Sequence, residues 1–428
     1  MKALPKSVVV IIAIAALLAA ASIATAQSAS TRNTGNATLV LTGAKIYPSP
    51  DAAAIPDGVV VIRNGKIAAV GKREEVTIPR NAKTLNCTGM IVTAGFQNSH
   101  VHFMEPKWNK AETQPAPRLS TQLASMFTVY GFTTVVDIGS IFPNTSALRS
   151  RIESGEVIGP RIIAPIAILY PPDGLPIYIQ EFRAANSWTP DEPATPEAAI
   201  NIVRRYKGES HDILKLFTGS FVTYQNIKPM PLDVARAAVD EAHKEGRLAF
   251  AHPSNDEGMQ VAIDAGVDIL AHTASAGGPW SPALVDNMKK HNMAVVPTLK
   301  LWKYVFMGAP DQAPAEQMLQ NCVEQLKTFS SAGGQVLFGT DVGFMIDYDP
   351  VDEYVYMNRA GLSPMQILAA LTTAPTARFK EDDHRGRVAA GLDADLVVLG
   401  SDPAQDVRHF TDVRYTIRQG KIIYPLSH

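Results

Sequence analysis

The chain has 428 residues, of which 46% are hydrophobic and 19% are charged, and this composition excludes a disordered chain and a small disulfide-stabilised mini-protein. The formal net charge is −2 and runs of Lys and Arg are absent, which argues against a nucleic-acid or anionic-lipid partner and favours a small-molecule ligand. Cys87 and Cys322 can form at most one disulfide, which the sequence leaves open, so any metal here relies on His and carboxylate side chains.

The N-terminus predicts a cleaved secretory signal over residues 1–26. Lys2 and Lys6 precede an apolar run that covers about residues 8–21. Ala-Thr-Ala at residues 24–26 has the form of a signal-peptidase site. A membrane anchor is the alternative, but the apolar run is short. No other stretch approaches the ~18 uninterrupted apolar residues of a spanning helix. We therefore expect an exported mature protein, periplasmic or secreted, that is not held in the membrane.

Two β-rich segments flank the middle of the chain. Residues 27–90 contain short apolar, β-branched runs broken by Gly, Pro and Asn, with Asn64-Gly65 as a hairpin turn. Residues 386–428 have the same texture, with strands expected at 395–399, 413–417 and 421–424. Because both segments flank a different kind of sequence, we expect them to complete one small composite β-sandwich domain.

Residues 91–385 alternate between strand, loop and helix. Helical spacing over residues 231–246 and 256–266 is followed in each case by a short apolar strand, and the pattern continues to residue 339. Such alternation predicts parallel β/α units, and eight strands fit a catalytic (β/α)8 TIM-like barrel. A doubly wound open sheet is the alternative, but no Gly-rich phosphate-binding fingerprint follows the first strand.

Four histidines and an aspartate lie where these predicted strands end. His100 and His102 are two residues apart in an extended segment, so both imidazoles point the same way. His252, His272 and Asp341 end three later strands. One such His, or Asp341 as a helix N-cap, would be ordinary structure. Together, at the face where barrel enzymes place their active sites, they predict a metal centre.

Lys215 lies inside the apolar run at residues 211–217. An unpaired ammonium is costly there and would repel a nearby metal. A snorkelling or ion-paired lysine is the ordinary explanation. If carbon dioxide carbamylates the amine instead, the side chain becomes a carboxylate whose two oxygens can bridge two cations, and that species fits among four histidines and an aspartate.

In their order along the chain, six candidate ligands resemble the metal-dependent amidohydrolase superfamily: His100, His102, Lys215, His252, His272 and Asp341. The similarity is to the binuclear branch that contains imidazolonepropionase-like proteins and Xaa-Pro dipeptidases, and it covers nearly the whole mature chain. The resemblance implies that His100, His102 and Asp341 bind the more buried metal. It also implies that carbamylated Lys215 bridges two metals and that His252 and His272 hold the second one.

The chemistry implied by the resemblance is hydrolysis by metal-activated hydroxide. Two divalent ions, most naturally zinc with manganese, cobalt or nickel as alternatives, lower the pKa of water and polarise a carbonyl. Asp341 takes a proton from the water and passes it to the leaving nitrogen. We expect cleavage of an amide or other C–N bond of a small molecule, such as a dipeptide or an N-acyl amino acid. Lactonase, phosphotriesterase-like or deaminase activity is the alternative on the same site, and a catalytically silent binding scaffold is the alternative of another class.

The loops after the predicted strands offer aromatic side chains that can hold an apolar acyl group at a barrel mouth. Trp108, Tyr224 and Phe344 are the candidates, although each is equally suited to packing a loop. Tyr224 is favoured because its loop directly follows Lys215. The acidic residues at positions 347, 349, 352 and 353 are expected to form a solvated loop and helix start. A homo-oligomer is compatible with the sequence.

Overall fold

The computed structural model describes residues 38–140, 142–186, 189–205, 208, 212–307 and 312–426. The predicted signal segment at residues 1–26 lies outside these residues, so its cleavage stays a prediction. Among the described residues, no helix has the length and apolar character needed to cross a membrane. Cys87 and Cys322 are both buried and unpaired.

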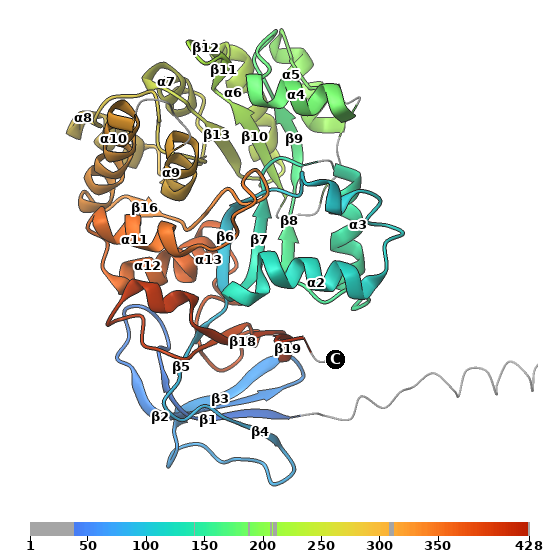
Figure 1. The fold of residues 1–428 in the computed structure, drawn as a ribbon, viewed down its shortest axis with the longest axis vertical. Coiled ribbons are helices and arrows are strands. Elements are labelled where there is room, and N and C mark those ends of the chain that lie inside the picture. Colours follow the sequence, from blue (N-terminus) through green and yellow to red (C-terminus); the bar gives the residue numbers. More distant parts are fainter. Residues whose placement is uncertain are drawn as a thin grey trace, which may run out of the picture.

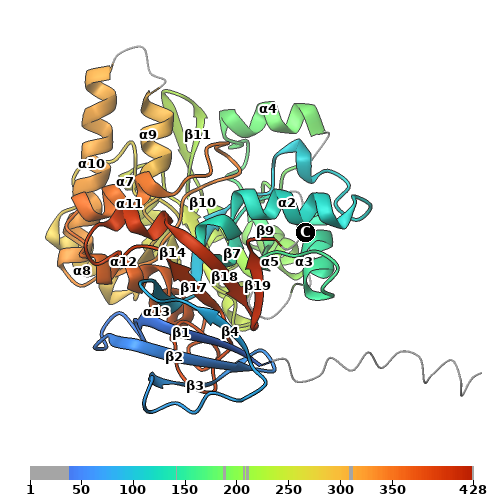
Figure 2. The ribbon, with the colours of Figure 1, turned by 60° about the horizontal axis from the view of Figure 1, so that its bottom comes forward.

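One eight-stranded sheet combines the two ends of the chain. Its order is β19-β18-β17-β5-β1-β2-β3, with β4 paired to β1. Figure 2 shows the blue N-terminal strands beside the red C-terminal ones. The N-terminal strands are β1 (Leu39–Ile46), β2 (Ile55–Arg63), β3 (Lys66–Lys72), β4 (Lys83–Asn86) and β5 (Ile91–Ala94), and the C-terminal strands are β17 (Leu396–Leu399), β18 (Val413–Arg418) and β19 (Lys421–Tyr424). We call this the composite sheet. Its division into a sandwich and the predicted domain boundaries stay predictions.

The pattern in β2 explains how the composite sheet is covered on both faces. Val60 and Ile62 pack into one apolar cluster, whereas Val59 and Val61 pack into another on the opposite face, as the two-residue period of a strand requires. Asn64 and Gly65 have φ values of 52° and 77°. This geometry suits a tight hairpin turn between β2 and β3, as predicted.

Parallel strands form the middle of the molecule, above the composite sheet in Figure 1. One group has the order β6-β7-β8, and the other has the order β16-β15-β14-β13-β10-β9. The strands are β6 (Phe96–Val101), β7 (Phe132–Asp137), β8 (Arg161–Ile163), β9 (Pro165–Leu169), β10 (Ile213–Phe217), β13 (Ala249–His252), β14 (Ile269–Leu270), β15 (Ala294–Val295) and β16 (Gln335–Val336). Only Ala164 separates β8 from β9. The N–H groups of Ser99 and His102 donate to the carbonyls of Phe338 and Val342, at 2.7 and 2.8 Å, so hydrogen bonds also link β6 to the segment after β16.

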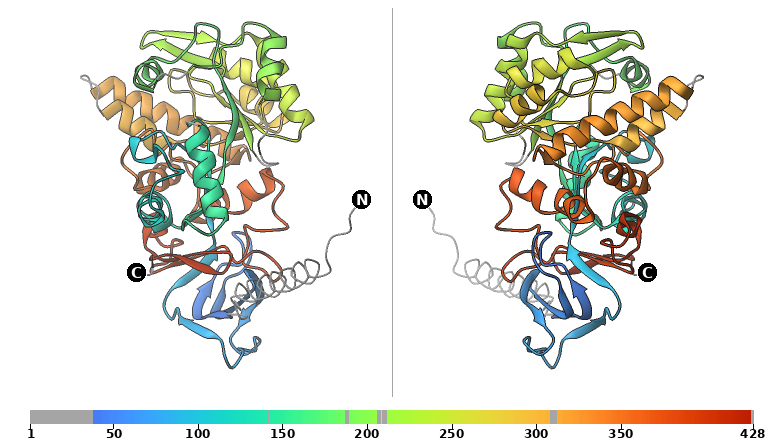
Figure 3. Two further views of the ribbon diagram at one scale, coloured as in Figure 1. Left: turned by 90° about the vertical axis from the view of Figure 1, so that its right-hand side faces the viewer. Right: turned by 90° about the vertical axis from the view of Figure 1, so that its left-hand side faces the viewer.

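Helices connect the parallel strands and pack outside them (Figure 3). They are α2 (Ala116–Met126), α3 (Phe142–Glu153), α4 (Ile177–Asn186), α5 (Pro196–Arg205), α6 (Leu232–Lys244), α7 (Asp256–Asp264), α8 (Pro282–Lys290), α9 (Leu299–Met307), α10 (Gln312–Ser331), α11 (Val351–Arg359), α12 (Pro364–Leu371) and α13 (Thr373–Arg378). Short 3-10 helices are η1 (Pro106–Trp108), η2 (Thr128–Tyr130) and η3 (Val407–Thr411), and a separate hairpin consists of β11 (Gly219–Thr223) and β12 (Asn226–Pro229).

Alternate residues of β10 belong to two different cores. Leu214 and Leu216 pack into the large cluster that includes helix residues such as Val234. Ile213 packs into a second cluster with Phe250, which lies on the neighbouring strand β13. Since side chains alternate along a strand, Lys215 lies on the Ile213 side, among the parallel strands rather than under the helices.

The apolar run at residues 90–96 is divided between the two sheets. The sequence predicts one strand here, at the start of the parallel units. In the structure β5 pairs with β1 and β17, and β6 begins at Phe96 and pairs with β7. Only Gly95 separates the two strands, and a continuous apolar run contains no signal for a change of partner sheet.

Candidate metal centre

All six predicted ligands lie at one place among the parallel strands, although they come from five different segments. His100, Lys215 and His252 lie in β6, β10 and β13, respectively. His102, His272 and Asp341 lie in the segments that follow β6, β14 and β16. The carboxyl ends of parallel strands share one edge. This common edge is what brings together residues that are up to 241 positions apart, as His100 and Asp341 are.

Asp341 is the residue around which the histidines gather. Its Oδ1 atom lies 3.0 Å from Nε2 of His102 and 3.4 Å from Nε2 of His100. Its Oδ2 atom lies 3.8 Å from Nε2 of His272. The His252 ring packs against the His272 ring with the centroids 4.5 Å apart.

Burial sets the protonation states in this cluster. It lowers the pKa of His100 to about 4 and holds the pKa values of His252 and His272 well below their usual range. Burial alone would raise the pKa of Asp341, but the adjacent imidazoles of His100 and His102 bring it well below its ordinary value. His100, His252 and His272 therefore present neutral imidazoles beside the ionised carboxylate of Asp341, and these are the forms in which such side chains bind a divalent metal.

Several of these candidate ligand atoms form no hydrogen bond within the described chain. Among the described residues, Nε2 of His100, Nε2 of His252 and Oδ1 of Asp341 are buried without a hydrogen-bond partner. Buried polar atoms are usually paired, because leaving one unpaired costs free energy. The ligand atoms of His100, His272 and Asp341 also lie within 4.8 Å of one another. These unpaired, convergent donors fit a bound metal.

The outward nitrogens of the first two histidines are fixed by backbone carbonyls. Nδ1 of His100 lies 2.7 Å from the Ala271 carbonyl oxygen, and Nδ1 of His102 lies 2.7 Å from that of Gly139. A carbonyl only accepts, so each Nδ1 carries the proton and each Nε2 keeps its lone pair. The buried Asp137 accepts from the Gly139 N–H at 3.0 Å and thereby fixes the turn that holds His102.

His272 is held through a side-chain hydroxyl. Thr298 Oγ1 donates to the Pro297 carbonyl at 2.8 Å and lies 2.7 Å from His272 Nδ1, whose proton it accepts. Thr298 has a φ of +49°, an uncommon conformation for a β-branched residue. Two residues later, the Lys300 N–H donates to Oε2 of the fully buried Glu353 at 2.7 Å. Glu353 thus fixes the start of α9, which directly follows Thr298, the residue that accepts from His272.

Lys300 joins this support to the segment after Asp341. Its Nζ donates to the Asp347 carbonyl at 2.8 Å and to the Asp349 carbonyl. The prediction that the acidic residues form a solvated loop and helix start is therefore wrong for Glu353. The sequence shows four acidic residues close together, but only the packing of α11 against α9 determines which one is buried.

The backbone of the Asp341 segment is tightly constrained. Asp341 has a φ of +63°, a left-handed value that is uncommon outside glycine and recurs at functional sites. Gly343 has a φ of +98°, and a Cβ atom there would lie 1.8 Å from the His102 carbonyl oxygen. A glycine at this position lets the Asp341 segment pass close to β6 and bring the carboxylate to the histidines.

The three predicted substrate contacts lie in different surroundings. Trp108 is 0% exposed and packs against Phe103 with the ring centroids 5.2 Å apart, so it has no free surface. Tyr224 is 76% exposed at the turn between β11 and β12. Phe344 is 37% exposed, and its ring packs edge-on against Tyr178 at 5.5 Å. Of the three, Phe344 follows Asp341 most closely in the chain, and the preference for Tyr224 stays a prediction.

Sequence reasoning did not single out the other aromatic residues next to the ligands. Phe217 stacks on His252 at 4.9 Å and on Tyr170 at 4.7 Å. Trp302 lies 5.3 Å from the His272 ring and donates to Thr273 Oγ1 at 2.9 Å. No motif marks these residues. The position of Phe217 at the end of a strand, two residues after Lys215, is the one available signal.

Comparisons with known proteins agree with this geometry. The amidohydrolase family matches residues 91–423. An uncharacterized protein of Mycobacterium tuberculosis is 28% identical over 231 residues, which are 50% of this chain and 58% of that protein, so the match spans less than two thirds of the relative.

Two solved structures share the overall α/β fold. A Xaa-Pro dipeptidase with methionine bound in its active site superposes with a TM-score of 0.75 at 22% identity and covers 90% of this chain and 99% of its own. The ochratoxinase of Aspergillus niger superposes with a TM-score of 0.74 at 18% identity over 90% and 95% of the two chains. With residues 91–423 matched, the chain belongs to the amidohydrolase family, a family of hydrolases.

Proposed function

We propose that this enzyme uses two divalent metal ions to cleave an amide or other C–N bond of a small molecule, such as a dipeptide or an N-acyl amino acid. The observation that carries the proposal is the convergence of buried ligand atoms that have no hydrogen-bond partner among the described residues, at Nε2 of His100, Nε2 of His252 and Oδ1 of Asp341. Family membership favours hydrolysis as the chemistry that such a centre performs.

The proposed assignment divides the ligands between two sites. One metal is held by His100, His102 and Asp341, and the other by His252 and His272. The tight group formed by His100, His272 and Asp341 crosses this division, which favours two metals close together rather than two separate sites. Zinc is the proposed metal, since imidazole nitrogen and carboxylate oxygen suit it.

Carbamylated Lys215 is the proposed bridging ligand. Burial lowers the pKa of Lys215 to about 7, against the opposing effect of the Asp341 carboxylate. A large fraction of this amine is therefore neutral near pH 7, and the neutral amine is the form that attacks carbon dioxide. Lys215 is 2% exposed, which favours a bound and coordinated state over a solvated ammonium.

In the proposed reaction, divalent ions supply Lewis acidity to a substrate carbonyl and lower the pKa of water. Asp341 performs the proton transfers. Its carboxylate accepts a proton from the attacking water and then donates it to the leaving nitrogen. Backbone carbonyls hold the Nδ1 protons of His100 and His102, so the Nε2 atoms of both rings face Asp341.

The surroundings favour a substrate with an apolar part. Phe217, Trp302 and the edge-on pair of Tyr178 and Phe344 border the ligands or the segment after Asp341. Aromatic side chains of this kind bury the apolar groups of small ligands. We therefore place N-acyl amino acids with apolar acyl groups, and dipeptides with apolar side chains, first among the substrates.

The closed (β/α)8 barrel is part of this proposal. The hydrogen bonds from Ser99 and His102 to Phe338 and Val342, together with the near-continuity of β8 and β9, support closure of the parallel strands into one ring of eight. In such a barrel the carboxyl ends of all strands face one mouth.

We also propose that the enzyme is exported after cleavage near residue 26. The apolar run followed by Ala-Thr-Ala at residues 24–26 motivates this proposal. Intact-mass measurement of the exported protein is expected to give an N-terminus at or near Gln27. Retention of Met1 in a membrane fraction would contradict it.

The test of the proposed function combines metal analysis with a substrate panel. Elemental analysis of protein purified without chelator is expected to give two metals per chain after reconstitution. The metal-loaded enzyme is then assayed on N-acyl amino acids, dipeptides, lactones and organophosphates, with the chelator-treated enzyme as control. Turnover of the C–N substrates alone supports the proposal. Turnover confined to lactones or organophosphates, or a stoichiometry that stays at one metal, would overturn it.

A further inference from the structure

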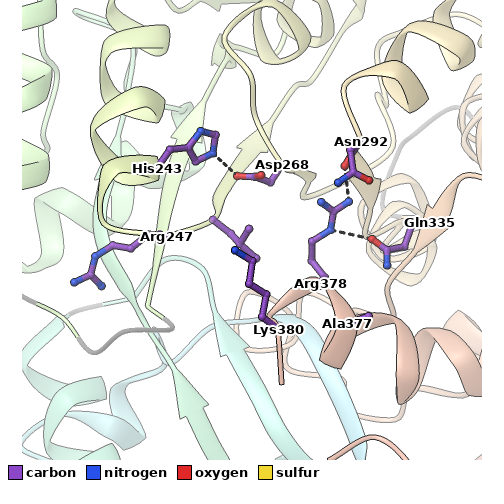
Figure 4. Close-up of a pocket in the computed structure, with 10 residues that line it drawn as sticks. His243, Arg247, Asp268, Asn292, Gln335, Ala377, Arg378 and Lys380 are labelled. Atoms are coloured by element: carbon purple, nitrogen blue, oxygen red, sulfur yellow. Dashed lines mark hydrogen bonds and ion pairs between the residues drawn. The ribbon is translucent and has the colours of Figure 1, made fainter. Parts of the chain in front are cut away.

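A cavity of about 520 Å³ opens at the amino ends of the parallel strands. Its walls come from the residues that precede or begin strands β13 to β16 and from the end of α13 (Figure 4). Active-site ligands lie at the opposite, carboxyl ends of these strands. The cavity is therefore separate from the candidate metal centre.

Arg378 places a buried positive charge in the wall of the cavity. Only 9% of this residue is exposed. Its Nε donates to Gln335 Oε1 at 2.9 Å, and Nη2 donates to the Asn292 carbonyl at 2.6 Å. Both acceptors are neutral. Among the described residues, Nη1 has no hydrogen-bond partner and no carboxylate forms an ion pair with this guanidinium. A buried cation without an ion-pair partner is costly, so an anion placed against this guanidinium would be stabilised.

Asp268 acts on Arg378 only at a distance: burial lowers the pKa of Arg378 and the charge of Asp268 opposes that effect, but no ion pair joins these two described residues. Asp268 lies in the wall, but its Oδ2 atom is 2.8 Å from His243 Nε2 and also accepts from the Ala249 N–H at 2.8 Å. The hydrogen bond from His243 to Asp268 raises the pKa of His243, which favours the charged imidazolium opposite this carboxylate. The Asp268 carboxylate is thus already hydrogen-bonded to His243 and to the Ala249 N–H.

Lys380 adds a second cation at the rim. It is an exposed residue, and within the described chain its ammonium forms no hydrogen bond or ion pair. Figure 4 shows its side chain extending toward the His243–Asp268 pair, whereas Arg247 turns away from Arg378. Arg247 Nε donates to Glu245 Oε2 at 2.8 Å, so its charge is partly compensated. Arg378 and Lys380 are therefore the two cations available to a ligand.

Arg378 and Lys380 lie at the C-terminal end of α13, and this position accounts for their positive charge but not for the burial of Arg378. Cations near a helix C-terminus interact favourably with the helix dipole, and α13 ends at Arg378. A dipole role does not require a guanidinium that is nine-tenths buried, nor a cavity in front of its unused nitrogen. Both features are typical of an anion-binding site.

We propose that this cavity binds a small organic molecule through its phosphate group, with Arg378 at the floor and Lys380 at the rim as the recognising cations. Two available cations match a dianion, and the planar guanidinium matches two phosphate oxygens. The volume of about 520 Å³ exceeds what a free phosphate ion fills and leaves room for the rest of an ester. Leu248 and Ala377 supply apolar surface for that part.

Isothermal titration of the metal-loaded protein tests this proposal with phenyl phosphate, inorganic phosphate and benzoate as probes. Phenyl phosphate is expected to bind most tightly. Lys380→Glu and Arg378→Gln are each expected to weaken that binding about tenfold or more, because each removes a charged donor. Lys72→Glu makes the same charge change at an exposed lysine of β3 and is expected to leave the affinity unchanged.

Three outcomes would overturn the proposal. Equal affinity for phenyl phosphate in all variants would place the binding elsewhere, including the metal centre. Tighter binding of inorganic phosphate would exclude an organic ester, and tighter binding of benzoate would exclude phosphate recognition. If Arg378→Gln does not fold, because it loses its hydrogen bond to Asn292, the exposed Lys380→Glu variant alone decides the outcome.

Discussion

The composite sheet and the candidate metal centre treat buried polar groups in opposite ways. In the composite sheet, the buried Asp395 accepts from the Gln419 N–H at 2.7 Å, and Asp402 accepts from Lys45 at 2.7 Å and from Tyr47 at 3.0 Å. In the metal centre, His252 Nε2 and Asp341 Oδ1 have no partner among the described residues. The comparison indicates that the sheet is built for stability, whereas the centre keeps its polar atoms free for a ligand at a cost in stability.

The largest effect expected from breaking the metal centre is at Lys215. Lys215→Ala and Lys215→Arg are both expected to lose most of the metal and to lower kcat by about 10³ or more, because neither side chain can become a bridging carbamate. Elemental analysis and steady-state kinetics measure the two effects. A short carboxylic acid added to Lys215→Ala is expected to restore part of both.

The arginine variant is the decisive one at this position. Near-normal metal content and turnover in Lys215→Arg would mean that Lys215 is an ordinary ion-paired residue, and the binuclear assignment would fail with it. Lys72→Arg, at an exposed lysine of the composite sheet, is the matched control and is expected to behave as wild type.

A smaller loss is expected at Asp341. Asp341→Asn retains an oxygen ligand but cannot carry the proton, so kcat should fall by at least about 10² while KM changes little. Stopped assays with an established substrate measure both constants. Asp383→Asn, whose side chain is 77% exposed, serves as control. Activity within a few-fold of wild type would remove Asp341 from the proton transfer.

In the composite sheet, a substitution is expected to lower stability while leaving activity unchanged. Leu396 is 0% exposed and packs in the apolar cluster of β1, β2 and β17. Leu396→Ala is expected to lower the free energy of unfolding by about 2–5 kcal/mol, with kcat and metal content of the folded protein unchanged. Leu396→Met should cost less than about 1.5 kcal/mol. Urea denaturation gives the stabilities, and a matching fall in kcat would show that the two regions are coupled.

A further effect, on the pH dependence of stability, concerns Glu353, which supports the centre but lies outside it. Burial raises the pKa of Glu353 to about 8, well above its value of 4.5 when exposed. Between these values the folded protein binds more protons than the unfolded chain, so stability falls as pH rises from about 4.5 to about 8, by up to about 1.4 kcal/mol per pH unit.

Glu353→Gln tests this pH dependence because it keeps an acceptor for the Lys300 N–H but cannot ionise. Its stability is expected to decline less than that of wild type between about pH 6 and about pH 9, as measured by urea denaturation at both values. Parallel profiles for the two proteins would show that Glu353 does not titrate in this range. Asp352→Asn, on the same helix turn, is the control.

Much of the fold was predictable because its signals are local. The Asn64-Gly65 turn, the strands near residues 396–399 and 413–418 and the helix at residues 232–244 all follow from turn chemistry and apolar periodicity. The division of residues 90–96 between two sheets was not predictable. Partner choice in a continuous apolar run depends on contacts with β17, some 300 residues away.

The candidate ligands and their order could be identified from the sequence, because His, Lys and Asp in or just after apolar strands lie near the edge where the carboxyl ends of parallel strands meet. The sequence did not determine the supporting residues. Thr298 acts through its hydrogen bond with His272, and Glu353 acts through the hydrogen bond that it accepts from α9. Trp108 and Tyr224 have opposite exposures that no local pattern indicates. Tertiary structure decided these features, since burial and hydrogen-bond partners depend on which distant segments meet, and that depends on the packing of the whole chain.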